Sequence, residues 1–162
     1  MRAVVQRARD AQVVVDGSTT AEFTGPGLMI LVGITHTDTV ADAHRLANKI
    51  FELRIFGPEH ASEPITDGRR ELSASELGLP VIVVSQFTLY GDTRKGRRPT
   101  WTSAAPGPIA EPLVAEVVSA LRNAGAEVGT GIFGADMAVR FTNDGPITLV
   151  LEVGDHAPGA TP

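Results

Sequence analysis

The chain has 162 residues, a length that fits one compact domain, and its 43% hydrophobic and 20% charged residues suit a folded protein with a real core. It contains no cysteine, which excludes disulfides, thiolate nucleophiles and cysteine-ligated zinc. The formal net charge of −5 argues against a general nucleic-acid binder held by bulk electrostatics, although a local basic patch stays open.

The N-terminal third is predicted to be β-structure. Residues 2–8 and 11–16 have strand character, and Asp16-Gly17 is a turn signal after them. Gly25-Pro26-Gly27 predicts a break in the chain before a third strand at Leu28 to Ile34. A sheet built from neighbouring strands is therefore expected at the start of the chain.

A helix and a long irregular segment follow. Asp38 is the expected N-cap of a helix that runs to about Leu53 with apolar residues at helical spacing. Residues 57–80 hold several Gly-Pro and Asp-Gly turn signals, so we expect an irregular excursion, which in a compact domain is usually functional or mobile. Val81 to Tyr90 is then predicted to be a strand that enters the interior.

The C-terminal half is predicted to contain one helix and more strands. A basic and then proline-rich loop covers residues 91–108, and a helix follows from about Ile109 to Asn123. Pro112 is tolerable only in the first turn of that helix, and Gly125 marks its end. Further strands are expected near 126–131, 135–142 and 147–153.

Strands thus outnumber the two helices, without β-α-β alternation or an internal repeat. We predict an α+β fold, in which a strongly curved, mostly antiparallel, barrel-like sheet is flanked by two helices. Residues 1–153 are expected to form a single domain, and the small residues of 154–162 to form a disordered C-terminal tail.

Nothing in the sequence predicts membrane association. The longest apolar runs, 28–34 and 79–84, are far too short to span a bilayer. The N-terminus alternates polar and apolar residues and lacks the apolar region and cleavage site of a signal peptide. We therefore expect a cytoplasmic protein.

The sequence has no familiar catalytic motif: no Gly-x-Ser-x-Gly elbow, no His-Glu-x-x-His, no P-loop and no dinucleotide-binding glycine pattern. The four histidines show no metal-ligand spacing: His36, His44, His60 and His156. We therefore expect neither a metal nor another cofactor.

Two short polar segments break the local pattern, as functional segments tend to do. In the first, Ser85-Gln86-Phe87-Thr88-Leu89, alternation predicts one face for Ser85, Phe87 and Leu89 and the other face for Gln86 and Thr88. The second is Asn143-Asp144-Gly145-Pro146-Ile147-Thr148, where an X-Pro bond can be cis and the glycine allows a ligand to approach closely. From spacing alone, a structural strand end and an ordinary β-turn remain alternatives to a site.

The only dense cationic cluster lies in the segment at 92–99 and comprises Arg94, Lys95, Arg97 and Arg98. A solvated loop and a phosphate-binding loop both remain open for it.

Five blocks in order resemble the D-aminoacyl-tRNA deacylase family, and the likeness runs from Met1 to about Val153. The blocks are residues 1–7, 85–89, 92–99, 131–137 and 143–148. The resemblance implies the family's fold, a tRNA substrate, no cofactor, and a homodimer in which the Gly-Pro segment of one subunit enters the active site of the other. Residues 57–80 and the stretch Thr100-Trp101-Thr102-Ser103 depart from the usual family sequence.

The resemblance also implies roles for single residues. Ser85, Gln86, Phe87, Thr88 and Leu89 would line the pocket for the terminal adenosine and its aminoacyl ester. Gly145 and Pro146 would face the α-carbon of the substrate, and Arg7 would fix their orientation. Phe133 and Met137 would wall the adenosine side, and the cluster at 94–98 would bind tRNA.

The reaction implied is hydrolysis of the ester that joins a D-amino acid, and also glycine, to the 3′-terminal adenosine. Because this ester is already activated, positioning, an oxyanion donor such as the Phe87 N–H and a placed water suffice, with help from the adenosine 2′-OH. An L side chain would be rejected by the Gly145 and Pro146 carbonyls. Two rivals remain: a hydrolase with Thr88 or Ser85 as covalent nucleophile, and a non-enzymatic nucleic-acid-binding module.

Overall fold

A five-stranded sheet organises residues 1–154, the part of the chain that the computed structural model describes. Its strand order is β6-β5-β2-β1-β7, with bounds β1 Arg2–Val15, β2 Ser18–Gly33, β5 Val81–Ser85, β6 Val128–Thr130 and β7 Met137–Glu152. β1 pairs antiparallel with both β2 and β7, whereas β5 runs parallel to β2, and β6 runs parallel to β5. The prediction of a mostly antiparallel sheet is therefore confirmed, with a parallel part at the β5–β6 edge.

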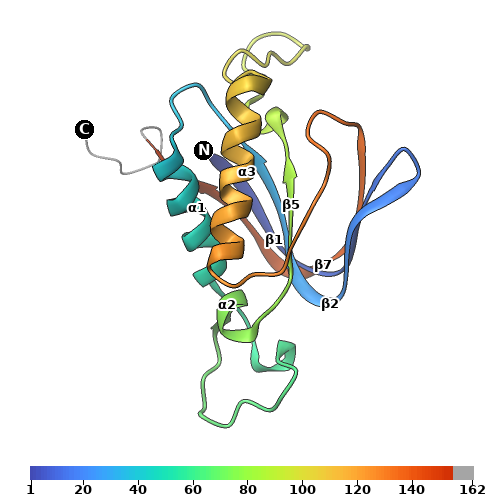
Figure 1. Cartoon of the computed structure of the whole chain (residues 1–162), viewed down its shortest axis with the longest axis vertical. Coiled ribbons are helices and arrows are strands. Elements are labelled where there is room, and N and C mark those ends of the chain that lie inside the picture. The colour runs from blue at the N-terminus through green and yellow to red at the C-terminus, as the bar shows by residue number, and fades with distance from the viewer. Residues whose placement is uncertain (155–162) are drawn as a thin grey trace.

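Two long helices, α1 (Val40–Glu52) and α3 (Gly107–Asn123), cover one face of this sheet (Figure 1). Side chains of β5 alternate between the two faces of the sheet. Val81 and Val83 belong to the hydrophobic cluster under the helices, whereas Ile82 and Val84 belong to a second hydrophobic cluster on the other face. Leu46 of α1 and Leu121 of α3 are fully buried in the first cluster. The predicted α+β class is thus confirmed.

The sheet is strongly curved because the β1–β2 hairpin bends over its second face. Ala11, Val13 and Ala21 of the hairpin pack with Ile82 and Val84 of β5 in the second cluster. The bend coincides with a register shift between Arg9 and Ala11, where Asp10 has a φ of 53°. Among the residues described, β6 and β7 form the two edges, so strand pairing does not close the sheet into a barrel.

Two predicted breaks are bulges within longer strands. The segments 2–8 and 11–16 form the single strand β1, and Gly25-Pro26-Gly27 lies inside β2. Pro26 pairs with Arg9 and Gly27 with Ala8, so the register shift absorbs the extra residues and the strand continues.

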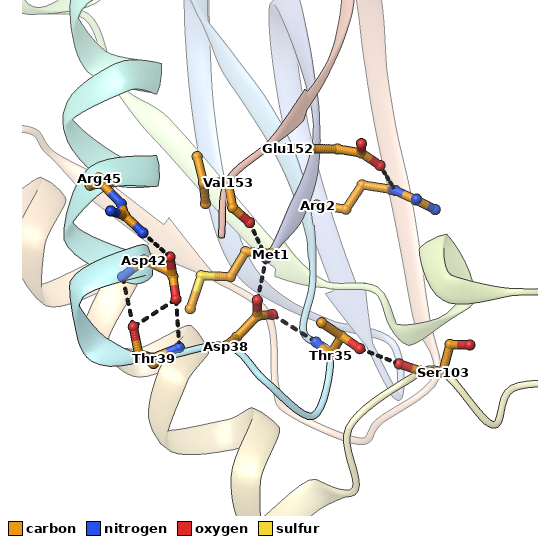
Figure 2. A network of polar contacts seen from close by, with 10 residues as sticks. All are labelled: Met1, Arg2, Thr35, Asp38, Thr39, Asp42, Arg45, Ser103, Glu152 and Val153. Carbon is orange, nitrogen blue, oxygen red and sulfur yellow. Dashed lines mark hydrogen bonds and ion pairs between the residues drawn. The ribbon is translucent and has the colours of Figure 1, made fainter. Parts of the chain in front are cut away.

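The first helix begins one residue later than predicted, because Thr39 and not Asp38 is its N-cap. The Thr39 hydroxyl accepts a hydrogen bond from the Asp42 amide at 3.3 Å, and Asp42 Oδ2 accepts one from the Thr39 amide at 2.8 Å. Asp38 instead accepts from the Thr35 amide at 2.7 Å and from the α-amino group of Met1 (Figure 2). This links the start of β1 to the turn before α1.

The excursion at 57–80 is only partly irregular. It contains a 3-10 turn at Pro58–His60, the short strand β4 (Leu72–Ser73) and the one-turn helix α2 (Ala74–Leu77). β4 pairs antiparallel with β3 (Arg54–Phe56), which follows α1. The short capping box at Ser73, which starts α2, is a signal that the turn-rich composition concealed.

Two further boundaries differ from the prediction. α3 begins at Gly107, so Pro112 lies inside the helix and beyond its first turn. The strands expected at 135–142 and 147–153 are one strand, β7, whereas β6 lies where a strand was expected.

No helix among residues 1–154 is long and apolar enough to cross a membrane. The disorder expected for 154–162 concerns residues that, except Gly154, lie outside the described range.

Candidate active site

A pocket of about 440 Å³ opens where β5 ends, between the N-terminal half of α3 and the loop that precedes β7. Its walls are mainly apolar, and its polar side chains are Ser85, Gln86 and Asp136. Phe133 of the loop and Met137 at the start of β7 also line it, together with Val32, Ile34, Val84, Phe87, Ala105, Gly107, Ala110, Val114, Gly134, Ala135 and Val139. A concave, apolar site with a few convergent polar groups is typical of small-ligand binding.

The chain leaves the sheet at Ser85, so the strand predicted over 81–90 ends five residues early. The Gln86 amide donates the last bond toward β2, to the Val32 carbonyl at 2.7 Å, and Phe87–Tyr90 form a 3-10 helix. The alternation predicted for Ser85, Phe87 and Leu89 is therefore wrong beyond Ser85. This helix places the Phe87 amide at its first position, where an N–H has no acceptor within the helix.

Phe87 and Thr88 both project outward from the 3-10 helix. Phe87 is 56% exposed and packs edge-on against Trp101, with ring centroids 5.5 Å apart. The Thr88 hydroxyl lies 2.5 Å from Gln86 Nε2, which donates to it. Neither Thr88 nor Leu89 lines the pocket, although both were predicted to belong to the site.

The Gly145–Pro146 segment is a protrusion within β7 and not a turn between two strands. Asn143 pairs with Ala8 and Thr148 pairs with Gln6, so residues 144–147 all lie opposite Arg7. The Gly145–Pro146 bond is cis, and both residues are exposed. Arg7 donates to the Asp144 carbonyl through Nε and to the Gly145 carbonyl through Nη2, each at 2.9 Å.

Within one subunit the protrusion and the pocket are far apart. β7 is separated from β5 by β1 and β2, and Arg7 is in register with Leu28 and, through it, Val81. The separation between the protrusion and Ser85 at the pocket is therefore three strand spacings of about 4.8 Å across the sheet and four residues of about 3.3 Å each along β5. The structure therefore brings together Ser85, Gln86, Phe87, Phe133 and Met137, and separately Arg7, Gly145 and Pro146.

A sequence profile described as D-Tyr-tRNA(Tyr) deacylase matches residues 4–152. A D-aminoacyl-tRNA deacylase of Acidothermus cellulolyticus is 58% identical over 153 residues, which cover 94% of this chain and 99% of that relative. The chain belongs to the D-aminoacyl-tRNA deacylase family. The predicted family resemblance is thereby confirmed, and the enzyme class expected from it agrees with the family's description.

Solved structures of similar proteins support the fold of this family member. A structure titled c-Myc DNA unwinding element binding protein has a TM-score of 0.83 and 33% identity, and the match covers 95% of this chain and 99% of that one. A second, titled as a probable eukaryotic D-amino acid tRNA deacylase, has a TM-score of 0.79 at 17% identity and covers 94% and 98% of the two chains. The predicted deacylase-like fold is confirmed.

His60 is a site-associated residue that the sequence did not reveal, and Asp144, within the predicted segment 143–148, was given no role of its own. His60 is buried, and its Nε2 lies 2.9 Å from Asp144 Oδ2, which also accepts from Arg9 at 3.2 Å. Partial burial would raise the pKa of Asp144, but the His60 hydrogen bond and the Arg7 and Arg9 charges outweigh it and lower the pKa. Because 84 residues separate His60 from Asp144, no local pattern could have paired them.

The four predicted tRNA-binding cations lie in a short loop that Asp92 and Thr100 close by two backbone hydrogen bonds of 2.9 and 3.0 Å. Lys95, Arg97 and Arg98 are exposed, whereas Arg94 forms a bidentate pair with Asp92. The side-chain hydrogen bond from Arg94 lowers the pKa of Asp92 to about 2. The four cations are therefore not equivalent, since one of them is engaged within the loop.

Proposed function

We propose that this family member hydrolyses the ester between a D-amino acid and the 3′-terminal adenosine of tRNA. The observation that carries the proposal is the pocket lined by Ser85, Gln86 and Phe87 in a chain of the D-aminoacyl-tRNA deacylase family. Its volume of about 440 Å³ falls in the range of small-ligand sites, and its apolar walls suit an adenine ring and an aminoacyl group. The Phe133 and Met137 side chains form the wall against which the adenosine packs.

The chemistry rests on backbone and substrate groups. The Phe87 N–H donates to the oxyanion that develops on the ester carbonyl, and the adenosine 2′-OH assists the attacking water. Among the described residues that line the pocket there is no histidine, lysine or arginine to activate a serine or threonine. The neighbour of the Thr88 hydroxyl is the Gln86 amide, which is a donor and no base. These contacts favour a direct attack of water over a covalent intermediate.

The site is completed by a second copy of the chain. The Gly145–Pro146 segment cannot reach the pocket of its own subunit. Its proposed contact with the substrate therefore requires the pocket of a partner subunit. An apolar row across three adjacent strands offers a surface for pairing: Val4 of β1 is in register with Leu31 of β2 and with Val150 of β7. Val150 is 64% exposed, so a partner would cover it.

Selection between enantiomers follows from steric rejection. The Gly145 and Pro146 carbonyls would face the substrate α-carbon, where an L side chain collides and a D side chain or the hydrogen of glycine does not. Within one subunit no atom lies within 4 Å of a Cβ built on Gly145. Crowding at Gly145 therefore arises only when the substrate and the partner are in place. Glycine wrongly attached to tRNA is accepted on the same grounds.

The direct test is incubation of the protein with matched D-tyrosyl-tRNA, L-tyrosyl-tRNA and glycyl-tRNA, following loss of the ester over time. We expect hydrolysis of the D and glycyl substrates and little action on the L substrate. Comparable rates on the two tyrosyl enantiomers would refute the proposed selection, and no hydrolysis of any of them would refute the reaction.

A further inference from the structure

His60 connects the segment after α1 to the protrusion that holds Gly145 and Pro146. Its side chain is only 2% exposed and packs edge-on against Phe56, with ring centroids 5.3 Å apart. The ring lies between Gly57 and Glu59 on the Nδ1 side and Asp144 on the Nε2 side. A buried histidine with both nitrogens engaged has a fixed orientation.

The contact with Asp144 shows that Nε2 of His60 is a hydrogen-bond donor. Nε2 faces the Asp144 carboxylate, which accepts, so Nε2 carries a proton. Nδ1 lies near one donor, the Gly57 amide at 3.0 Å, and near two acceptors, the Gly57 carbonyl at 3.1 Å and a Glu59 carboxylate oxygen at 3.3 Å. Nε2 donates to Asp144 Oδ2 at 2.9 Å. The carboxylate of Asp144 is thus held by the His60 Nε2–H from one side and by the Arg9 guanidinium, at 3.2 Å, from the other.

Asp144 is the residue through which the protrusion is anchored. Its carbonyl and that of Gly145 accept from Arg7, whose third donor, Nη1, binds the Ile55 carbonyl at 2.6 Å. The Asn143 side chain closes the base of the protrusion by donating to Thr148 Oγ1 at 3.1 Å. Gly145 and Pro146 themselves are exposed, so the contacts of Asp144 and Arg7 determine where the Gly145 carbonyl points.

We propose that His60 is a positioning residue that, through Asp144, fixes the Gly145 carbonyl for its contact with the substrate. The inference rests on the proposed function of Gly145 and Pro146. It gives the Pro58–His60 turn a role, since His60 and the Ile55 carbonyl brace the protrusion from the same stretch of chain. His60 does not touch the substrate in this scheme and acts only by restricting the protrusion.

Three substitutions separate the link to Asp144 from the packing and capping roles of the same ring. His60→Gln keeps a donor near the position of Nε2 and can still reach Asp144, whereas His60→Asn keeps a polar group near Nδ1 and reaches only Gly57. His60→Ala removes both contacts. His44→Ala is the matched control, because His44 also pairs with a carboxylate, that of Glu116 at 2.6 Å, but this pair joins the helices α1 and α3.

The readout is the ratio of kcat/KM for D-tyrosyl-tRNA to that for L-tyrosyl-tRNA, measured beside the thermal midpoint. We expect His60→Ala and His60→Asn to lower this ratio about tenfold, the effect of losing one hydrogen bond to a charged group. His60→Gln should stay within about threefold of the unchanged protein, and His44→Ala should not change the ratio. An unchanged ratio in His60→Ala, or equal losses in the Gln and Asn variants, would overturn the inference.

A second measurement keeps the inference testable without substrate. Amide hydrogen exchange of Gly145 and Ile147 should be faster in His60→Asn and in Asp144→Ala than in His60→Gln, because only the first two lose the link. Unchanged exchange in all three variants would refute the link. If the wild-type protein fails to discriminate between enantiomers while exchange responds as expected, the proposed function fails and the positioning of the protrusion by His60 stands.

Discussion

Phe87 carries two groups that mutation can separate, an amide N–H at the start of a 3-10 helix and an exposed ring against Trp101. Proline is tolerated at a first helical position and lacks only the N–H, whereas alanine keeps the N–H and loses the ring. We expect kcat of Phe87→Pro to be about 10²–10³-fold lower than kcat of Phe87→Ala, which is the usual effect of deleting an oxyanion donor. Single-turnover deacylation of D-tyrosyl-tRNA measures this, and equal rates in the two variants would remove the amide from the mechanism.

Thr88 tests the covalent alternative at the scale of one hydroxyl. Because its neighbour is the Gln86 side-chain amide and it lies outside the pocket lining, Thr88→Ala should keep kcat within about tenfold of the wild-type value. A loss near 10⁴-fold, of the order expected for deleting a nucleophile or its base, would favour a covalent mechanism. Trapping an acyl-enzyme by acid quench and mass spectrometry would decide for that mechanism outright.

At the scale of elements, the capping box of α1 makes a pH prediction possible. Burial would raise the pKa of Asp42, but hydrogen bonds from Thr39 and Arg45 outweigh it and hold the pKa below its ordinary value of 3.8. A carboxylate with a lowered folded pKa stabilises the protein above its unfolded value and loses that contribution as the pH falls through the folded pKa.

The wild-type protein should therefore lose free energy of unfolding more steeply than Asp42→Asn between about pH 4 and pH 2. Urea unfolding across this range measures the difference. Glu52→Gln, which changes an exposed carboxylate near the end of the same helix, is the control and should follow the wild-type curve. Parallel curves for wild type and Asp42→Asn would contradict the expectation.

The basic loop makes a prediction about salt. Lys95, Arg97 and Arg98 point into solvent, so neutralising any one should weaken tRNA binding and flatten the slope of log K against log salt by about 0.7–0.9 per phosphate contact. Arg94→Gln should change the slope less, because Arg94 is already paired with Asp92. Filter binding at several salt concentrations gives the slopes, and four unchanged slopes would make the loop a solvated turn.

Elements with a strong local pattern were predictable from the sequence, and those set by distant partners were not. The two helices and the strand start at Val81 follow from apolar spacing and were predicted within a few residues. The Phe87–Tyr90 helix was mistaken for strand because its departure from the sheet depends on the hydrogen bond of Gln86 to Val32. The protrusion in β7 was divided into two strands because only pairing with β1 shows that the strand continues.

The candidate site, too, was predictable only in part from the sequence. Spacing left Ser85–Leu89 and Asn143–Thr148 open between a site and ordinary structure, and only the family resemblance assigned them roles. Neither the residue spacing nor the family resemblance could reveal the contact of His60 with Asp144, because that contact depends on the fold of the Pro58–His60 turn. Thr88 and Leu89 were expected in the pocket because the resemblance assigned the whole segment 85–89 to it, whereas the chain leaves the sheet at Ser85.

At the scale of the whole molecule, the two parts of the proposed site lie on the same sheet but beyond each other's reach. The pocket is at the end of β5. The protrusion lies on the edge strand β7, and β1 and β2 lie between β7 and β5 in the sheet. A symmetric dimer would create two equivalent sites, each from the pocket of one subunit and the protrusion of the other. The proposed activity therefore depends on association.

Complementation between two defective variants tests this shared site most directly. Gly145→Ala places a methyl group where the substrate must approach, and it should fold normally, because Gly145 is not in the left-handed region and no atom lies within 4 Å of the new Cβ. Phe87→Pro removes the oxyanion donor from the pocket. Each variant alone is expected to have low activity toward D-tyrosyl-tRNA.

The decisive measurement is the D-tyrosyl-tRNA hydrolysis rate after the two variants are unfolded, mixed in equal amounts and refolded together. In a shared-site dimer, half of the dimers are mixed and each mixed dimer regains one intact site, so about a quarter of the wild-type rate should return. A rate equal to the mean of the rates of the two separate variants would mean that a working site does not combine the pocket of one subunit with the protrusion of the other. That result would contradict the account.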